Sequence, residues 1–205
     1  MSNDIQITLM RHGRSRADDE GVHEGRYDSP LTEIGISQVQ ARADEFLRRE
    51  FIFDKIIAST MIRAQETANI VGKVLKTPIE SDPDWMEFNN GPLAGLPFDV
   101  AEERYPTPQF RNPFEPFHGS GESDLEFHRR GSKAIENIVR RGTGNYLVVA
   151  HGGILNAALR TVLGAPPFTW KQGAVFAFGD TGYTRLRYQP DQNRWILLEL
   201  NSGFL

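Results

Sequence analysis

The sequence contains no cysteine. This absence excludes disulfide bonds, thiolate metal sites and a cysteine nucleophile, and it agrees with a reducing compartment. Long apolar runs are also missing: the longest, such as residues 146–150, reach about five residues, whereas about 20 are needed to span a bilayer. Residues 1–4 carry no basic group, and the stretch 5–9 is too short and too polar for a signal peptide. We therefore expect a cytoplasmic protein without a membrane segment.

The chain also lacks an excess of positive charge. It has 23 lysine and arginine residues against 27 aspartate and glutamate residues, which gives a net charge of −4. This balance argues against a nucleic-acid-binding protein that works by bulk charge, although it leaves room for a local anion site. The 205 residues include 24% charged and 10% aromatic side chains, as in ordinary folded domains. We expect residues 1–205 to form a single domain.

Apolar periodicity and capping signals predict strands that alternate with helices. The expected strands are residues 5–10, 55–58, 146–150, 174–178, 183–188 and 195–200. The expected helices cover residues 36–47 behind an N-cap at Thr32, residues 64–75, a short stretch around 99–104, the residues that follow a Ser123–Glu126 capping box, and residues 154–163. This order predicts an α/β fold with a mostly parallel central sheet, helices on both of its faces, and antiparallel strands near the C-terminus.

Residues 88–121 form a segment of different composition. It holds six of the twelve prolines and five of the thirteen phenylalanines, and it shows little periodicity. One interpretation is a packed surface loop. The other is a lid or cap insertion over a site at the strand ends, because long ordered insertions in compact domains are often functional.

Two expected strands run directly into a His-Gly pair. The first gives His12-Gly13, preceded by Arg11, and the second gives His151-Gly152. The carboxyl ends of parallel strands form the binding crevice of such sheets, so the two imidazoles can converge there. Glycine after each histidine lets other groups approach the ring closely.

Two further residues are candidates for the same site. Arg63 lies in the first turn of an expected helix, where the helix dipole disfavours a cation. It is either a surface arginine paired with Glu66 or a ligand for an anion bound at the helix N-terminus. Glu87 stands between large apolar residues, surroundings that favour a protonated carboxyl and suit a general acid.

Together these motifs resemble the histidine phosphatase superfamily, which is also called phosphoglycerate mutase-like. The resemblance rests on residues 11–15, 29–35, 59–67, Glu87 and residues 151–153, and it spans nearly the whole chain. It implies a reaction that needs no metal and no cofactor. The implied catalytic residues are His12 as the nucleophile that becomes phosphorylated, Glu87 as the proton donor, and Arg11, Arg63 and His151 as ligands of the phosphate oxygens. The candidate substrate-binding residues are Arg11, Gly13, Ser15, Asp18, Glu24, Gly25, Arg63 and Gly152.

Two positions near the expected phosphate site depart from the family pattern. Asp18 stands where many relatives have asparagine, and Glu24 stands where they often have glutamine. An unpaired carboxylate there would repel a phosphate dianion, so we expect both to pair with Arg14, Arg16 or Arg26, or to turn away. The alternatives are that they recognise a cationic or hydroxyl-rich part of the substrate, or that they are sequence drift on a loop.

The residues after Glu87 favour a phosphatase over a mutase. Mutases of this family resemble Glu-Arg-His-Tyr-Gly at this point, whereas the chain has Phe88-Asn-Asn-Gly91 and lacks the arginine and tyrosine anchors. The expected function is hydrolysis of a small phosphorylated metabolite. A cofactor-dependent phosphoglycerate mutase and a catalytically silent phosphate-binding protein are the alternatives. His23 and His118 are further candidates to face the substrate, and no oligomeric state is predicted.

Overall fold

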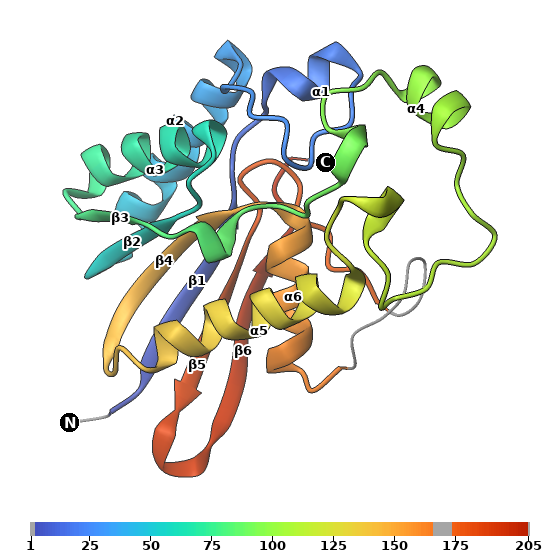
Figure 1. Ribbon diagram of the computed structural model, residues 1–205. Helices are drawn as coiled ribbons and strands as arrows, with labels where there is room; N and C mark the ends of the chain where they lie inside the picture. The colour runs from blue at the N-terminus through green and yellow to red at the C-terminus, as the bar shows by residue number, and fades with distance from the viewer. Residues whose placement is uncertain (1–2, 166–173, 205) are drawn as a thin grey trace.

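The computed structural model describes residues 3–165 and 174–204, and a six-stranded sheet forms its centre (Figure 1). The strand order is β3-β2-β4-β1-β5-β6. The strands are β1 (Ile5–Arg11), β2 (Lys55–Ala58), β3 (Ile79–Ser81), β4 (Gly144–Ala150), β5 (Tyr183–Gln189) and β6 (Arg194–Asn201). The pairs β1–β4, β2–β4 and β2–β3 are parallel, whereas β1–β5 and β5–β6 are antiparallel. The predicted mostly parallel sheet with antiparallel C-terminal strands is confirmed.

Helices cover both faces of this sheet. They are α1 (Arg16–Glu20), α2 (Glu33–Arg48), α3 (Ile62–Leu75), α4 (Phe98–Arg104), α5 (Asp124–Val139) and α6 (Gly152–Val162). Side chains alternate between the faces along β4: Val148 packs in the cluster formed with α5 and α6, whereas Leu147 and Val149 pack in the cluster formed with α2 and α3. Because both faces of the sheet are buried, its central strands consist of nearly continuous apolar residues.

The predicted capping residues lie where the helices begin. The Thr32 side chain accepts a hydrogen bond from the Gly35 N–H and starts α2, and Ser123 and Glu126 form the capping box of α5. Two residues expected on the buried face of α2, Ile36 and Leu47, are instead about half exposed. The buried stripe runs through Gly35, Val39, Ala43 and Phe46, and the two exposed residues lie beside it.

The predicted strand at residues 174–178 is wrong. These residues have no regular structure, and their backbone bonds to side chains of α6 instead of to another strand. Asn156 accepts from the Phe176 N–H at 2.8 Å and donates to the Phe176 carbonyl at 3.0 Å, while Arg160 donates to the Ala174 carbonyl at 3.0 Å. Two short elements, α1 and β3, were not expected from the sequence.

The 88–121 segment lies at the end of the molecule towards which β1 and β4 run (Figure 1). It contains α4 and two short 3₁₀ turns, Gly91–Leu93 and Phe117–Gly119. Backbone contacts join it to the loop after α1: Val22 and Pro97 form an isolated bridge, and the His23 N–H donates to the Leu96 carbonyl at 2.9 Å. Its role as a lid stays a prediction. Among the described residues, no helix combines the length and the hydrophobicity needed to cross a membrane.

Candidate active site

Three neighbouring parallel strands deliver polar side chains to one edge of the sheet. His12 follows β1, His151 follows β4 and Ser59 follows β2. The ladder continues past the strand ends, since the His12 N–H donates to the Ala150 carbonyl at 3.0 Å and the Ser59 N–H donates to the Val149 carbonyl at 2.9 Å. The parallel pairing therefore places the two histidines and the serine beside one another.

The His12 imidazole is buried and has a defined proton position. Its Nδ1 lies 2.7 Å from the Gly13 carbonyl oxygen, which can only accept, so Nδ1 carries the hydrogen. Nε2 therefore holds the lone pair, and it accepts a hydrogen bond from Arg63 Nε at 3.1 Å. Burial lowers the pKa of His12 well below 6.5, and the nearby charges of Arg63, Arg11 and His151 lower it further. The ring is thus neutral near pH 7.

His151 lies against His12, with 5.0 Å between the ring centroids. Its Nε2 is 2.8 Å from the Ser59 hydroxyl, and its Nδ1 is buried without a hydrogen-bond partner among the described residues. Burial lowers the pKa of His151 well below 6.5, with Arg63 and Arg11 adding to the effect. The site therefore holds two neutral imidazoles, one of which has a buried nitrogen left to bond a ligand.

Arg63 is fully buried, although it is an arginine in the first turn of α3. Besides His12, its guanidinium donates to the carbonyls of Tyr27 at 2.9 Å and Gly25 at 3.1 Å. The alternative of a surface ion pair with Glu66 is wrong, because the Glu66 carboxylate instead accepts the Leu31 N–H at 2.7 Å. Gly25 thus supports the site through its carbonyl, which holds the arginine in place.

Arg11 reaches the same edge of the sheet from the end of β1. It donates to the Phe178 carbonyl at 3.2 Å and lies 3.4 Å from Asp180 and 3.7 Å from Asp18. Burial raises the pKa of Asp180, and the charge of Arg11 opposes this rise. Sequence reasoning missed Asp180, since nothing in its local pattern links it to a residue about 170 positions earlier.

Asp18 and Glu24 lie among the site residues and share one serine hydroxyl. Asp18 accepts from the Ser15 N–H at 2.8 Å and from the Ser15 hydroxyl at 3.1 Å, and Glu24 accepts from the same hydroxyl. Glu24 also lies 3.5 Å from Arg63 Nε, as Asp18 lies near Arg11. Each arginine at this edge therefore faces a carboxylate.

The prediction that Asp18 and Glu24 pair with Arg14, Arg16 or Arg26 is wrong. Arg14 pairs with Asp19, and Arg16 pairs with Glu20 at 2.8 Å, so both arginines are already engaged on the surface around α1. Arg26 has no carboxylate within ion-pair distance among the described residues. On the short helix α1, Asp18 contacts Ser15 and lies near Arg11, whereas Asp19 pairs with Arg14. The sequence did not predict this helix, because the loop shows no periodicity.

Glu87 lies at the N-terminus of α6, the helix that begins directly after His151. Its carboxylate accepts from the N–H groups of Gly153 at 2.8 Å, Ile154 at 3.2 Å and Phe88 at 2.8 Å. Three backbone N–H groups therefore bond the carboxylate, although its large apolar sequence neighbours predicted apolar surroundings. A Cβ atom at Gly153 would collide with the Glu87 carboxylate, so glycine permits this approach. Gly152, in contrast, faces open space.

Arg130 of α5 holds the backbone that carries Glu87. Its guanidinium donates to the carbonyls of Asp84 at 2.9 Å, of Met86, and of Glu87 at 3.1 Å. It also forms a two-point contact with the Glu122 carboxylate, at 2.9 and 2.8 Å. Sequence reasoning missed this residue because an arginine on a helix ordinarily indicates a solvated face.

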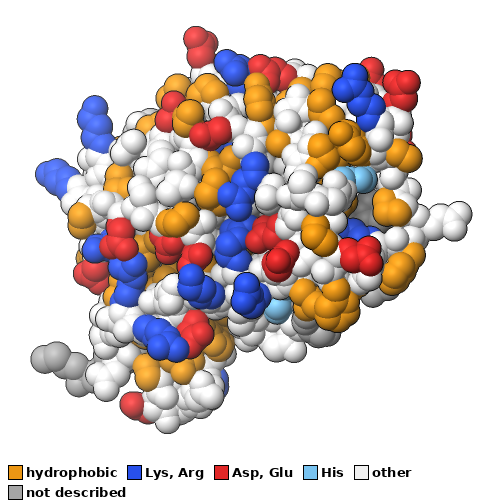
Figure 2. Space-filling model, viewed as in Figure 1, with side chains coloured by type: hydrophobic (Ala, Val, Ile, Leu, Met, Phe, Trp, Pro, Cys, Tyr) orange, Lys and Arg blue, Asp and Glu red, His pale blue; other side chains and the backbone are white. Residues whose placement is uncertain are grey.

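A cluster of charged side chains surrounds Arg130. Figure 2 shows basic and acidic side chains intermixed across the middle of the face seen in Figure 1. A cavity of about 790 Å³ lies here, lined among others by Arg26, Arg130 and Lys133 together with Asp84 and Glu122. Burial and the charge of Arg130 lower the pKa of Arg26. Within residues 3–165 and 174–204, no three His, Asp or Glu side chains lie close enough to hold a metal ion.

Taken together, the arrangement can hold a tetrahedral oxyanion. Two arginine side chains, two neutral imidazoles and the Ser59 hydroxyl meet at one edge of the sheet, and the lone pair of His12 Nε2 lies among them. The Glu87 carboxylate is bound to the helix that starts beside His151. Such a set combines a nucleophile, hydrogen-bond donors for an anion and a proton-transfer group.

Two comparisons with known sequences found matches that span most of the chain. The family model for the histidine phosphatase superfamily (branch 1) matches residues 7–202. The "Probable phosphoglycerate mutase GpmB" of Yersinia pestis is 35% identical over 166 residues, which cover 79% of this chain and 76% of that protein.

Two solved structures share the fold. A mycobacterial glucosyl-3-phosphoglycerate phosphatase in complex with VO3 has a TM-score of 0.81 at 24% identity and covers 97% of this chain and 99% of its own. The phosphoserine phosphatase of Entamoeba histolytica in complex with 3-phosphoglyceric acid has a TM-score of 0.74 at 20% identity, with 97% of each chain covered.

The two buried neutral histidines make the stability of the protein depend on pH. Unfolded histidines titrate near 6.5, and His12 and His151 titrate well below that value in the folded protein. Below pH 6.5 the unfolded state therefore binds more protons, and the free energy of unfolding falls as the pH drops. Each histidine contributes up to about 1.4 kcal/mol per pH unit.

Urea denaturation between about pH 7.5 and 5.5 measures this effect. We expect a double variant, His12→Gln with His151→Gln, to lose most of the slope that the unmodified protein shows. An equal slope in the two proteins would contradict the neutral state of the two rings.

Proposed function

The chain belongs to the histidine phosphatase superfamily, and from this premise we propose that it is a phosphomonoesterase acting through a phosphohistidine on His12. Its substrate in this proposal is a small phosphorylated metabolite. The observation that carries the proposal is the state of the His12 ring, which is neutral, protonated on Nδ1 and unprotonated on Nε2, where it accepts a hydrogen bond from Arg63. A neutral imidazole with a free lone pair is the nucleophile that this reaction needs.

In the first step, the lone pair of His12 Nε2 attacks the phosphorus atom, and the bond from phosphorus to the leaving oxygen breaks. Glu87 gives its proton to that oxygen, so the product leaves as an alcohol. The Nδ1 hydrogen stays on the ring, and the Gly13 carbonyl at 2.7 Å stabilises the positive charge that develops there. A bound dianionic phosphate favours the protonated carboxyl that this step requires.

In the second step, a water molecule attacks the phosphorus atom from the side of the departed alcohol. The bond from phosphorus to Nε2 breaks, its electron pair returns to the imidazole, and the Glu87 carboxylate takes the water proton. Inorganic phosphate leaves, and both residues regain their starting protonation states. One ester and one water thus give one alcohol and one phosphate, and the division into two displacements lowers each barrier.

Charge on the phosphoryl oxygens is met by groups that are already in position. In this proposal Arg11 and Arg63 donate to two oxygens, and the buried Nδ1 of His151, protonated, donates to a third. The Arg63 N–H that bonds Nε2 in the free protein passes to a phosphate oxygen when the substrate enters. This exchange frees the lone pair at the moment the phosphorus arrives.

A phosphoglycerate mutase is the second candidate, because the Yersinia pestis relative carries that name. The chain has Phe88-Asn-Asn-Gly91 after the proposed acid, without the arginine and tyrosine that the mutase pattern has there. We therefore expect 3-phosphoglycerate to be hydrolysed or left unreacted rather than isomerised.

A cytoplasmic location, which agrees with the absence of cysteine, stays a prediction.

Exchange of Glu87 for glutamine tests the acid role. Glu87→Gln removes the proton but keeps the shape, and we expect a loss of about 10²–10⁴ in rate for alkyl phosphates. The loss is smaller for p-nitrophenyl phosphate, whose leaving group needs little protonation. Release of inorganic phosphate is the measurement, with Glu103→Gln on the exposed face of α4 as a matched control. Equal losses for both leaving groups would contradict the acid role, and phosphate release by His12→Ala at the unmodified rate would contradict the proposed function.

Removal of the carboxylate at Glu24 tests how the pocket accepts a dianion. Glu24 lies 3.5 Å from Arg63 Nε and competes with the phosphate oxygens for that group. We expect Glu24→Gln to bind orthovanadate about tenfold more tightly, since the repulsion between the carboxylate and the anion is removed. The inhibition constant against p-nitrophenyl phosphate measures this change. Asp19→Asn, whose carboxylate pairs with Arg14 on the surface, is the control, and weaker inhibition in Glu24→Gln would refute the competition.

A primer dependence separates the mutase from the phosphatase. A cofactor-dependent mutase needs 2,3-bisphosphoglycerate to load its histidine, whereas a phosphatase loads it from each substrate molecule. We expect the turnover of phosphate monoesters to be the same with and without this primer, and 3-phosphoglycerate to give no 2-phosphoglycerate. Stimulation by the primer with appearance of the 2-isomer, followed by phosphorus NMR, would favour the mutase instead.

A further inference from the structure

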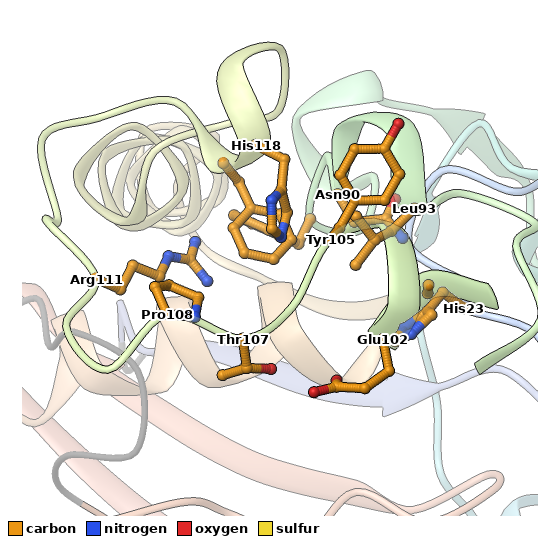
Figure 3. Close-up of a pocket in the computed structure, with 12 residues that line it drawn as sticks. His23, Asn90, Leu93, Glu102, Tyr105, Thr107, Pro108, Arg111 and His118 are labelled. Atoms are coloured by element: carbon orange, nitrogen blue, oxygen red, sulfur yellow. The ribbon is translucent and has the colours of Figure 1, made fainter. Parts of the chain in front are cut away.

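The 88–121 segment and the loop after α1 enclose a cavity of about 350 Å³ (Figure 3). Its volume lies in the usual range of small-molecule sites, which hold about 300–1,000 Å³. Five of its twelve lining residues carry aromatic rings, namely His23, Phe88, Tyr105, Phe117 and His118. These residues come from separate parts of the chain and gather around one space.

Four of these rings, all except that of His23, form a continuous aromatic wall. The centroids of Phe88 and Phe117 are 5.5 Å apart, those of Phe117 and His118 are 4.2 Å apart, and those of His118 and Tyr105 are 5.3 Å apart. The three contacts are edge-to-face, the geometry that aromatic pairs prefer. His118 has a left-handed backbone, with a φ of 45°. In this conformation its ring lies between the rings of Phe117 and Tyr105. Sterically costly backbone of this kind is typical of ligand-binding sites.

Two charged residues line the cavity besides the rings. Arg111 lies over the Phe117 ring at 4.2 Å and over the Phe88 ring at 5.0 Å, and Asp124 pairs with it at 2.6 Å. A carboxylate therefore balances the charge of Arg111. The other charged residue, Glu102, is solvent-exposed.

Two sequence neighbours connect the cavity to the candidate active site. Phe88 follows Glu87 directly, and it both lines the cavity and donates its N–H to the Glu87 carboxylate at 2.8 Å. On the other side, His23 precedes Glu24, which lies beside Arg63. Phe88 and His23 thus join the lining of the cavity to the two chain segments that carry Glu87 and Glu24.

We propose that this cavity binds the leaving-group half of the substrate and that this half carries an aromatic ring. The inference rests on the proposed phosphatase function and names the class of alcohol that it releases. Rings in the wall stack on a flat ring better than on a saturated one of the same size. The substrate is thus a phosphate monoester of an alcohol that bears an aromatic or heteroaromatic group.

Three primary alkyl phosphates with leaving groups of similar acidity test the proposal. They are 2-phenylethyl, 2-cyclohexylethyl and ethyl phosphate, compared by kcat/KM in the full chain. We expect the phenyl compound to exceed the ethyl compound by about tenfold or more, and the cyclohexyl compound by about threefold or more. Phe117→Leu and Tyr105→Leu, each removing one ring of the wall, should bring the phenyl and cyclohexyl values together.

Phe110→Leu is the matched control, because Phe110 belongs to the same segment but is exposed and does not line this cavity. It should leave the phenyl preference unchanged. Equal kcat/KM for the phenyl and cyclohexyl compounds, or a preference that survives in both ring variants, would overturn the proposal. The second ring variant keeps the test valid if the first does not fold.

A binding measurement keeps this proposal separate from the proposed function. If none of the three esters is hydrolysed, the phosphatase proposal fails. Titration of the protein with free 2-phenylethanol then tests the cavity by NMR, through chemical-shift changes of the aromatic protons of the cavity residues. We expect saturable shifts whose dissociation constant Tyr105→Leu raises about fivefold or more, and a dissociation constant for 2-cyclohexylethanol that is about threefold or more higher than that for 2-phenylethanol. The absence of shifts with 2-phenylethanol would overturn the aromatic assignment by itself.

Discussion

The hydrogen bond between His12 Nδ1 and the Gly13 carbonyl is the interaction on which the rest of the site depends. It fixes the hydrogen on one ring nitrogen and leaves the lone pair on the other, where Arg63 meets it at 3.1 Å. Burial and two nearby arginines keep the ring neutral, because a positive charge on the imidazole beside two guanidinium groups is unfavourable. In the proposed mechanism, the arginines that bind the phosphate thus also keep the His12 ring neutral.

The parallel sheet supplies the geometry for this arrangement. Residues that follow β1, β2 and β4 meet at one edge because their strands are neighbours in register. Two helices then add to the edge from opposite faces: α3 contributes a buried arginine, and α6 binds the Glu87 carboxylate with its first N–H groups. This edge therefore holds two arginines, Arg11 and Arg63, and three carboxylates that lie near them, those of Asp18, Glu24 and Asp180.

Sequence patterns predicted the elements whose signals are local. Apolar strands that end in His-Gly identified the two histidines, and an arginine in a first helical turn identified Arg63. Side chains that act across long sequence distances escaped this reasoning. The strand expected at 174–178 failed because Asn156, about 20 residues earlier, satisfies its backbone, and Arg130 was missed because its carbonyl partners lie more than 40 residues away.

The central claim is that His12 carries the phosphoryl group through Nε2. Phosphohistidine is a phosphoramidate, with a bond from phosphorus to nitrogen. It is labile in acid but survives in base. Rapid mixing with p-nitrophenyl phosphate, quenching in base and mass spectrometry of the peptides locate the group directly. The account predicts one phosphorylated peptide, containing His12 substituted on Nε2. A phosphoryl group on another residue, or turnover with no phosphorylated peptide at any mixing time, would contradict it.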